Sequence, residues 1–260
     1  MVLGGPWFGH AYLKPLVERL ARDFQVITYD ARGSGESSVR TPDQITLDGH
    51  VSDLESLRVG LGVERLNLVG HSFGAHVSML CAVERPETVE SLVLANPGPP
   101  FDVEMMQALQ SAFVRGHTTE ENKRIEEIKA SPDFKTRDAR TLEEFFKVQY
   151  ASFFKDRRHL ADLDFGFTSQ TALHALGAEQ PLVRRLLERN PAAALHTIKC
   201  PTLVVHAEHD LIPEAFSRFL ATKIRGAEYA RLNGVGHFAY LENPELFTNT
   251  VVTFLKANAR

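Results

Sequence analysis

Residues 70–74, with the sequence GHSFG, are the stretch whose residue types and spacing point most directly to chemistry. An apolar run with β character over residues 66–69 leads into it, and a helical pattern over 73–83 follows at once. A serine at so sharp a strand-to-helix turn needs glycine on both sides, because larger side chains would clash there. Such a turn exposes Oγ of Ser72 and directs free N–H groups of the helix start at negative charge formed beside it. The pattern therefore predicts a nucleophilic serine.

An acid and a histidine lie later in the chain, in the order that such a serine requires. Asp210 follows a predicted strand over 201–207, and His237 lies in the loop after the last predicted strand. In a parallel sheet both positions fall at the carboxyl ends of strands, on the edge where Ser72 emerges. Nε2 of His237 would take the Ser72 proton, while Asp210 would hold the imidazole tautomer and stabilise the imidazolium. These three residues are the predicted catalytic triad.

Four titratable residues crowd together at the end of the predicted strand 201–207 and raise the alternative of a metal site: His206, Glu208, His209 and Asp210. On a strand end their side chains diverge, which disfavours a shared metal ion. Neither a metal nor an organic cofactor is expected, because a serine triad needs none.

Asp30 is a rival for the acid, since it precedes a glycine-rich loop. The chain order of the triad favours Asp210, so we expect Asp30 and Arg32 to brace that loop instead. His71, next to the serine, is a candidate for lining the site or for supporting the turn.

Composition limits the function classes. The 260 residues are 43% hydrophobic and 24% charged, which is typical of a globular chain with a large core. A formal net charge of −4 and a pI near 6.3 disfavour a nucleic-acid or anionic-membrane surface. The only cysteines, Cys81 and Cys200, are expected to be buried thiols in a reducing compartment. Without a leader-like segment or an apolar run of transmembrane length, we expect a soluble cytoplasmic protein.

Strands and helices alternate through the first hundred residues. Such alternation implies a parallel sheet with right-handed crossovers, and the same pattern resumes after residue 195. The predicted strands cover residues 2–3, 24–29, 66–69, 91–95, 201–207 and 228–232, and the predicted helices of these parts cover 11–22, 46–60, 73–83, 213–224 and 244–257.

Residues 101–195 interrupt this rhythm, because they show no convincing buried strand. Helical patterns are predicted over 102–116, 119–130 and 142–155, with shorter helices up to residue 190. The predicted organisation is a core formed by residues 1–100 and 196–260, with 101–195 as a helical insertion.

Several motifs together resemble the α/β-hydrolase superfamily, and within it the proline iminopeptidase-like branch and its esterase-like relatives. The resemblance covers nearly the whole chain and implies a mostly parallel, doubly wound sheet with a helical cap formed by the insertion. The motifs are GGP at 4–6 with His10, YDARGSGES at 29–37, GHSFG at 70–74, PTLVV at 201–205 through Asp210, and GHF at 236–238 with LENPE at 241–245.

The resemblance also implies an oxyanion hole made by the amides of Phe73 and Gly5. Relatives usually carry histidine before the Gly-Gly-Pro turn and glycine after it, whereas this chain has Leu3 and Trp7. That departure alters the oxyanion loop and the acyl pocket, and it makes Trp7 and His71 candidates for lining the substrate pocket.

The substrate follows less directly from the resemblance. Aminopeptidases of this type tend to carry GGSWG at the turn, whereas GHSFG is commoner in esterase-like and carbon–carbon-bond hydrolases. An aminopeptidase also needs cap carboxylates for the substrate ammonium. The candidates for that role are Glu143, Glu144, Asp162 and Asp164.

A further departure lies at the start of the sequence. Relatives have two strands and most of a third before the glycine-rich turn, and the third lies inside the sheet. From the sequence we expect these N-terminal strands to be missing, which would leave neighbouring ladders unpaired.

The predicted function is therefore a serine hydrolase that cleaves a small ester or amide through an acyl-enzyme, as a carboxylesterase or a proline iminopeptidase-like aminopeptidase. The serine argues against dehalogenase and epoxide-hydrolase relatives, which use aspartate at the turn. The alternatives are a carbon–carbon-bond hydrolase and a non-hydrolytic ligand-binding protein on the same fold. The expected partner is a small ester, amide or short peptide, and the oligomeric state is left open.

Overall fold

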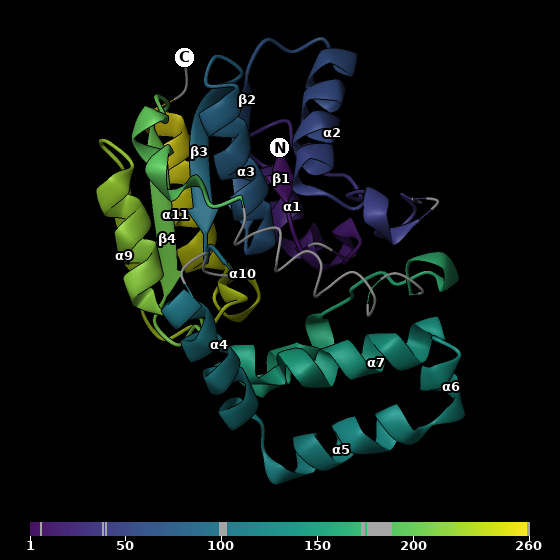
Figure 1. The fold of residues 1–260 in the computed structure, drawn as a ribbon. Coiled ribbons are helices and arrows are strands. Elements are labelled where there is room, and N and C mark those ends of the chain that lie inside the picture. Colours follow the sequence, from purple (N-terminus) through teal and green to yellow (C-terminus); the bar gives the residue numbers. More distant parts are fainter. Residues whose placement is uncertain are drawn as a thin grey trace.

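A computed structural model of the chain describes residues 1–5, 7–37, 39, 41–98, 103–172, 175 and 189–258. Its centre is a five-stranded parallel sheet of order β1-β2-β3-β4-β5 (Figure 1). The strands are β1 (Val2–Leu3), β2 (Leu66–His71), β3 (Val89–Ala95), β4 (Thr202–Ala207) and β5 (Glu228–Leu232). The parallel sheet of the predicted fold is confirmed.

The inner strands are buried on both faces, which explains their continuous apolar sequences. Every residue of β4 is buried, and so are all residues of β3 except Glu90. Helices α2 (Leu47–Gly60) and α3 (Phe73–Glu84) pack against each other, as do α1 (Lys14–Leu20) and α11 (Pro244–Ala257). In Figure 1, α3 and α11 lie on opposite faces of the sheet. The remaining core elements are η1 (His10–Leu13), η2 (Pro42–Gln44), α9 (Glu214–Lys223) and α10 (Ala239–Glu242).

Local sequence signals explain where several helices begin. The side chain of Thr46 accepts a hydrogen bond from the Gly49 amide and caps α2, and Asn243 caps α11 through the Leu246 amide. Pro244 occupies the first position of α11, where its missing N–H costs nothing. These helices start within one residue of the predicted positions.

The predicted strand over residues 2–3 is β1, the edge strand of the sheet, in which Val2 and Leu3 pair in parallel with Val69 and Gly70. The segment 24–29, expected to be a full strand, makes only one bridge, between Thr28 and Val2. Because β1 has only two residues, it offers too few backbone groups to pair a longer neighbour.

The described residues between 103 and 195 are helical wherever they form regular structure. In Figure 1, α4 to α7 gather at one end of the molecule, below the sheet. The last helix of this group begins three residues earlier than predicted and ends in a 3-10 turn. The elements are α4 (Val103–Gly116), α5 (Thr119–Ala130), α6 (Pro132–Lys135), α7 (Ala139–Tyr150), η3 (Ala151–Phe153), η4 (Arg157–Asp162), η5 (Pro191–Ala193) and η6 (Leu195–Thr197).

Some predictions fall outside the described residues: Pro6 of the glycine-rich turn, Ser38 after the 29–37 motif, residues 99–102 at the start of the insertion, and the short helices over 176–188. None of the helices in the described ranges is both long and apolar enough to cross a membrane. Cys81 and Cys200 are buried free thiols, as predicted.

Candidate active site

Ser72 lies between β2 and α3 in a backbone conformation that serine rarely adopts. Its φ is 56° and its ψ is −121°. A Cβ atom on Gly70 would lie 2.5 Å from the Gly74 carbonyl oxygen, and one on Gly74 would lie 2.4 Å from that of Leu3. Both flanking positions therefore require glycine for lack of space, as the sequence pattern predicted. Strain of this kind persists only where the surroundings enforce it, and it is concentrated at functional sites.

The backbone around Ser72 is tied to the neighbouring strand. The Ser72 amide donates to the carbonyl of Ala95, the last residue of β3, at 3.0 Å, and the Ser72 carbonyl accepts from the Ala75 amide at 3.0 Å. Phe73 is the first residue of α3, a position whose N–H has no partner within the helix. The Phe73 amide is thus placed beside the serine, where the predicted oxyanion donor belongs.

Asp210 and His237, which are 27 residues apart, meet in the interior. Nδ1 of His237 lies 2.8 Å from Oδ2 of Asp210, and their side chains are 2% and 0% exposed. The other carboxylate oxygen, Oδ1, accepts a hydrogen bond from the Ile212 amide at 3.0 Å. A buried carboxylate on Nδ1 fixes the tautomer that leaves Nε2 as the proton acceptor.

The loop that carries His237 is held by the helical insertion and by α10. The His237 amide donates to the Phe153 carbonyl at 2.9 Å, and the Gly236 amide donates to Oε2 of Glu242 at 2.6 Å. Oε1 of Glu242 accepts from the Asp156 amide at 3.1 Å. The ring centroids of Phe153 and His237 are 4.9 Å apart. Residues of the insertion thus contact the histidine directly.

His71 lies behind this loop and is not accessible as a pocket residue. It is 1% exposed, and its Nε2 atom lies 3.0 Å from the carbonyl oxygen of His237. Burial, together with the nearby His237, lowers the pKa of His71 to about 3. The neutral ring must carry its proton on Nε2 to donate to that carbonyl. Of the two roles considered for His71, the contacts favour support.

Asn96 is a site residue that the sequence analysis missed. It follows β3, is fully buried and has a φ of 45°. Its Nδ2 atom donates to the His237 carbonyl at 2.6 Å, and its Oδ1 atom accepts from the Ala207 amide at 2.9 Å. A polar residue directly after an apolar strand was the only sequence signal for this position.

The predicted oxyanion loop has an unexpected partner. The Gly5 amide donates a short hydrogen bond to the Tyr12 hydroxyl, so this N–H is already occupied. Tyr12 is 2% exposed, and burial raises its pKa well above the ordinary value. Trp7 is 6% exposed. Its indole is buried in the core cluster, which gives no support to a pocket-lining role.

Asp30 braces the loop that follows it, as predicted, whereas Arg32 binds Asp53 and the Gln44 carbonyl outside that loop. Oδ1 of Asp30 lies 2.7 Å from both the backbone amide and Nδ1 of His10, and its Oδ2 accepts from the Glu36 amide at 2.8 Å. Burial alone would raise the pKa of Asp30, but these donors outweigh it and hold the pKa below the usual value. Asp30 therefore binds two backbone amides and the His10 side chain, whereas His237 pairs with Asp210.

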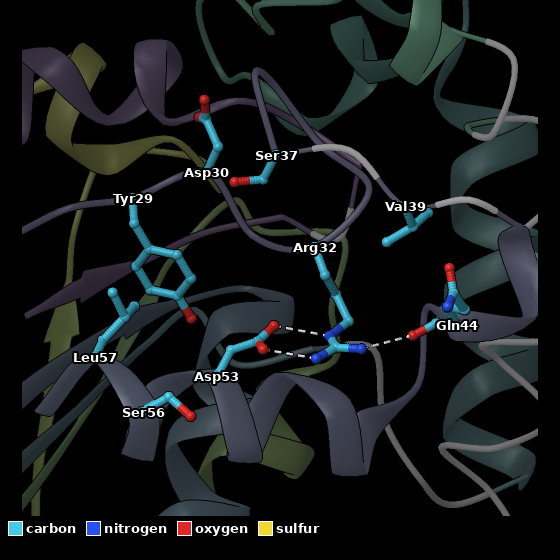
Figure 2. Close-up of a pocket in the computed structure, with 9 residues that line it drawn as sticks. All are labelled: Tyr29, Asp30, Arg32, Ser37, Val39, Gln44, Asp53, Ser56 and Leu57. Carbon is cyan, nitrogen blue, oxygen red and sulfur yellow. Dashed lines mark hydrogen bonds and ion pairs between the residues drawn. The ribbon is translucent and has the colours of Figure 1, made fainter. Parts of the chain in front are cut away.

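A cavity of about 660 Å³ lies beside this loop (Figure 2). Arg32 extends across it and binds Asp53 through two hydrogen bonds of 2.7 and 2.6 Å, with a third bond to the Gln44 carbonyl at 2.9 Å. None of its lining residues belongs to the predicted triad. They are Tyr29, Asp30, Arg32, Ser37, Val39, Gln44, Asp53, Ser56 and Leu57.

The carboxylates proposed for an aminopeptidase already have partners. Glu144 binds Arg124 at 2.6 Å, Asp162 lies 3.2 Å from His159, and Asp164 accepts from the Gly166 amide. Glu143 accepts from the Phe165 amide at 2.9 Å and lies 3.5 Å from Lys147. Burial raises the pKa of Glu143.

The crowded residues at the end of β4 diverge. His206 lies 3.1 Å from the Ser217 hydroxyl, Glu208 binds Arg231 and the Gly234 amide, and Asp210 contacts His237. Among the residues that the structure describes, no group of three or more His, Cys, Asp or Glu side chains could hold a metal ion.

Known proteins resemble this chain in sequence and in fold. The family model described as "Alpha/beta hydrolase family" matches residues 2–250. A protein of Rhizobium rhizogenes named "Putative carbamate hydrolase RutD" is 28% identical over 260 residues, covering 96% of this chain and 89% of its own. A protein of the same name from Yersinia enterocolitica is 27% identical over 251 residues, covering 94% and 82%.

Solved structures agree in fold. The enol-lactonase from Burkholderia xenovorans aligns with a TM-score of 0.72 at 23% identity, covering 98% of this chain and 90% of that one. The proline iminopeptidase from Mycobacterium smegmatis aligns with a TM-score of 0.67 at 20% identity, covering 99% and 88%.

Proposed function

Because the chain belongs to the alpha/beta hydrolase family, we propose that it is a serine hydrolase whose triad is Ser72, Asp210 and His237, acting on a small uncharged ester or carbamate. The observation that carries the proposal is the buried 2.8 Å contact between Nδ1 of His237 and Oδ2 of Asp210. The His237 carbonyl in this loop is hydrogen-bonded to His71, which precedes the strained Ser72, and to Asn96, whose neighbour Ala95 accepts a hydrogen bond from the Ser72 amide.

The reaction follows from these roles. Nε2 of His237 takes the proton from Ser72 as Oγ forms a bond to the substrate carbonyl carbon. The imidazolium then gives that proton to the leaving alcohol as its bond to carbon breaks, which leaves an acyl-enzyme on Ser72. A water molecule, deprotonated by His237, repeats the attack and frees the acid and the serine. Asp210 stays ionised throughout and stabilises each imidazolium.

The oxyanion hole of the proposal uses the amides of Phe73 and Gly5. Phe73 offers an N–H at the start of α3, where the helix dipole also favours negative charge. The Gly5 amide must exchange its bond with the Tyr12 hydroxyl for one to the substrate oxygen. Each donor to a developing oxyanion typically contributes about 3–4 kcal/mol to the stability of the transition state.

The preference for an uncharged substrate comes from the insertion. An amino-terminal substrate would bring an ammonium group that needs an unpaired carboxylate, whereas Glu143 and Glu144 each have a cationic neighbour. The insertion presents aromatic side chains to the core. The ring centroid of Phe165, for example, lies 4.0 Å from that of Phe8. The relatives named for carbamate hydrolysis favour including carbamates with esters.

We also propose that residues 101–195 act as a cap over a core formed by 1–100 and 196–260. The support is the contact of Phe153 with His237 and the hydrogen bond from the Gly9 amide to the Phe165 carbonyl at 2.7 Å. Both join the insertion to loops on the edge of the sheet that carries the triad.

The test is hydrolysis of p-nitrophenyl esters of graded acyl length, a p-nitrophenyl carbamate, and alanine and proline p-nitroanilides. We expect turnover of short esters or the carbamate and none of the free-amine anilides. Ser72→Ala should abolish that turnover. The matched control is Ser78→Ala. Ser78 is a buried serine of α3, the helix that follows Ser72, and its hydroxyl donates to the Gly74 carbonyl.

Three results would contradict the proposal. Turnover retained in Ser72→Ala would exclude the nucleophile. Hydrolysis of the anilides in preference to the esters would assign an aminopeptidase. Tight binding of ester analogues with no turnover would assign a ligand-binding protein.

A further inference from the structure

We propose that Asn96 is a positioning residue that sets the orientation of His237 by holding its backbone carbonyl. The inference rests on the proposed triad. Asn96 acts through the main chain of His237, whose carbonyl it binds.

The position of Asn96 brings three loops together. Its backbone amide donates to the Val205 carbonyl at 2.9 Å, and the preceding Ala95 carbonyl accepts from the Ser72 amide. Its side chain joins the Ala207 amide at 2.9 Å, where the chain leaves β4 for Asp210, to the His237 carbonyl at 2.6 Å. Asn96 therefore binds β4 and the His237 backbone directly, and it follows Ala95, which binds the Ser72 amide.

The chemistry of this site requires an amide side chain. The Ala207 N–H needs an acceptor and the His237 carbonyl needs a donor, and asparagine offers one of each. The residue is fully buried, so neither group can turn to water instead. A φ of 45° is also one that asparagine tolerates better than most residues. Aspartate would keep the acceptor but would face the His237 carbonyl with a second acceptor.

A second donor completes the clamp on the same oxygen. Nε2 of His71 lies 3.0 Å from the same carbonyl oxygen of His237 that Asn96 binds. Burial keeps His71 neutral, with a pKa of about 3, so it adds a donor without adding a positive charge beside the imidazolium. Because two donors hold the His237 carbonyl, the peptide plane between His237 and Phe238 cannot rotate freely. The His237 ring, which reaches Asp210, is fixed with it.

The experiment compares Asn96→Asp, Asn96→Gly and Ser91→Ala with the wild-type chain. Asn96→Asp keeps the shape and removes the donor, whereas Asn96→Gly removes the side chain and keeps the backbone conformation. Ser91→Ala is the control, because Ser91 is equally buried, lies in β3, which Asn96 follows, and donates its hydroxyl to Oδ1 of Asn67. The readouts are kcat and KM on the preferred ester, the thermal midpoint, and the downfield proton resonance of His237 Nδ1–H, assigned with His237→Gln.

We expect both Asn96 variants to lower kcat by about 100-fold, with KM within about twofold, since a misplacement of roughly 1 Å can cost that much. The Nδ1–H resonance should shift or broaden in both and stay unchanged in Ser91→Ala. Wild-type kcat and an unchanged resonance in folded Asn96→Asp and Asn96→Gly would overturn the proposal, as would equal changes in Ser91→Ala.

The resonance separates this inference from the proposed function. If the wild-type chain turned over no substrate, the proposed function would fail. The response of the His237 Nδ1–H signal to the Asn96 variants would still decide whether Asn96 positions that ring.

Discussion

Nδ1 of His237 and Oδ2 of Asp210 lie 2.8 Å apart, with both side chains almost fully withdrawn from solvent. A hydrogen bond to an ionised acceptor is strengthened in such surroundings, where water cannot compete for either group. The bond holds the ring by its far nitrogen and leaves Nε2 for proton transfer. Substitution of Asp210 should therefore change the rate of the proposed reaction.

Asp210→Asn tests the charge of the pair separately from its shape. The amide can still accept from the Ile212 N–H through its oxygen, so we expect the variant to fold. Its NH₂ group would favour the wrong tautomer of His237, and kcat should fall by about 10⁴-fold with little change in KM. Steady-state kinetics on the preferred ester are the measurement. A fall of less than tenfold would show that Asp210 does not serve the triad.

Gly74→Ala tests the space behind the serine. A Cβ atom there would lie 2.4 Å from the Leu3 carbonyl oxygen and 2.8 Å from the Gly4 amide nitrogen. Since backbone atoms must move, we expect a loss of about 1–3 kcal/mol in the free energy of unfolding, together with loss of activity. Gly60→Ala is the control, because nothing lies within 4 Å of a Cβ at that position. Equal urea-unfolding midpoints for the two variants would contradict the argument.

Tyr12→Phe tests whether the Tyr12 hydroxyl competes with substrate for the Gly5 amide. Removal of one neutral hydrogen bond, worth about 0.5–1.5 kcal/mol, should free that amide and raise kcat/KM by about two- to tenfold. The measurement is the rate on the preferred ester, with binding of a phosphonate analogue as a second readout. A fall of about 100-fold would instead identify the hydroxyl itself as an oxyanion donor.

Buried histidines should make stability depend on pH. Burial lowers the pKa values of His50, His71 and His76 to about 4, 3 and 4, below the ordinary value of 6.5. Their folded forms stay neutral while the unfolded chain binds protons, so their contribution is present above pH 6.5 and is lost as the pH falls towards 4.

Urea unfolding from pH 8 to pH 4.5 measures this dependence. Each histidine should contribute a slope of about 1.4 kcal/mol per pH unit below pH 6. His50→Leu should reduce the slope by about one proton, because it removes one such group. An identical slope in that variant would show that His50 titrates normally in the folded state.

Much of the site could be predicted because its signals are local. The need for glycine at position 70 comes from Gly74 and Ala75, a few residues away, and the strand that precedes Asp210, β4, is a continuous buried run. The meeting of the predicted triad residues at one edge follows from the parallel sheet alone. The helix from Pro244 to Ala257 was predicted to the residue, because asparagine and proline mark its start.

The parts that were missed depend on contacts that no local sequence pattern specifies. Asn96 reaches His237 across 141 positions, and no local pattern distinguishes such an asparagine from a turn residue. The bond from Gly5 to Tyr12 depends on the path of the loop between them. Phe24–Tyr29 has the composition of a strand, but the length of β1 limits its pairing to one bridge, between Thr28 and Val2.

The central claim is that Ser72 forms a covalent acyl-enzyme, and intact-protein mass spectrometry during turnover tests it most directly. With p-nitrophenyl acetate, rapid acid quenching should trap one added acetyl group, located on the peptide that contains Ser72. A burst of p-nitrophenol equal to the enzyme concentration should accompany it. Steady turnover without acylation of Ser72, or with the acetyl group on another residue, would contradict the account.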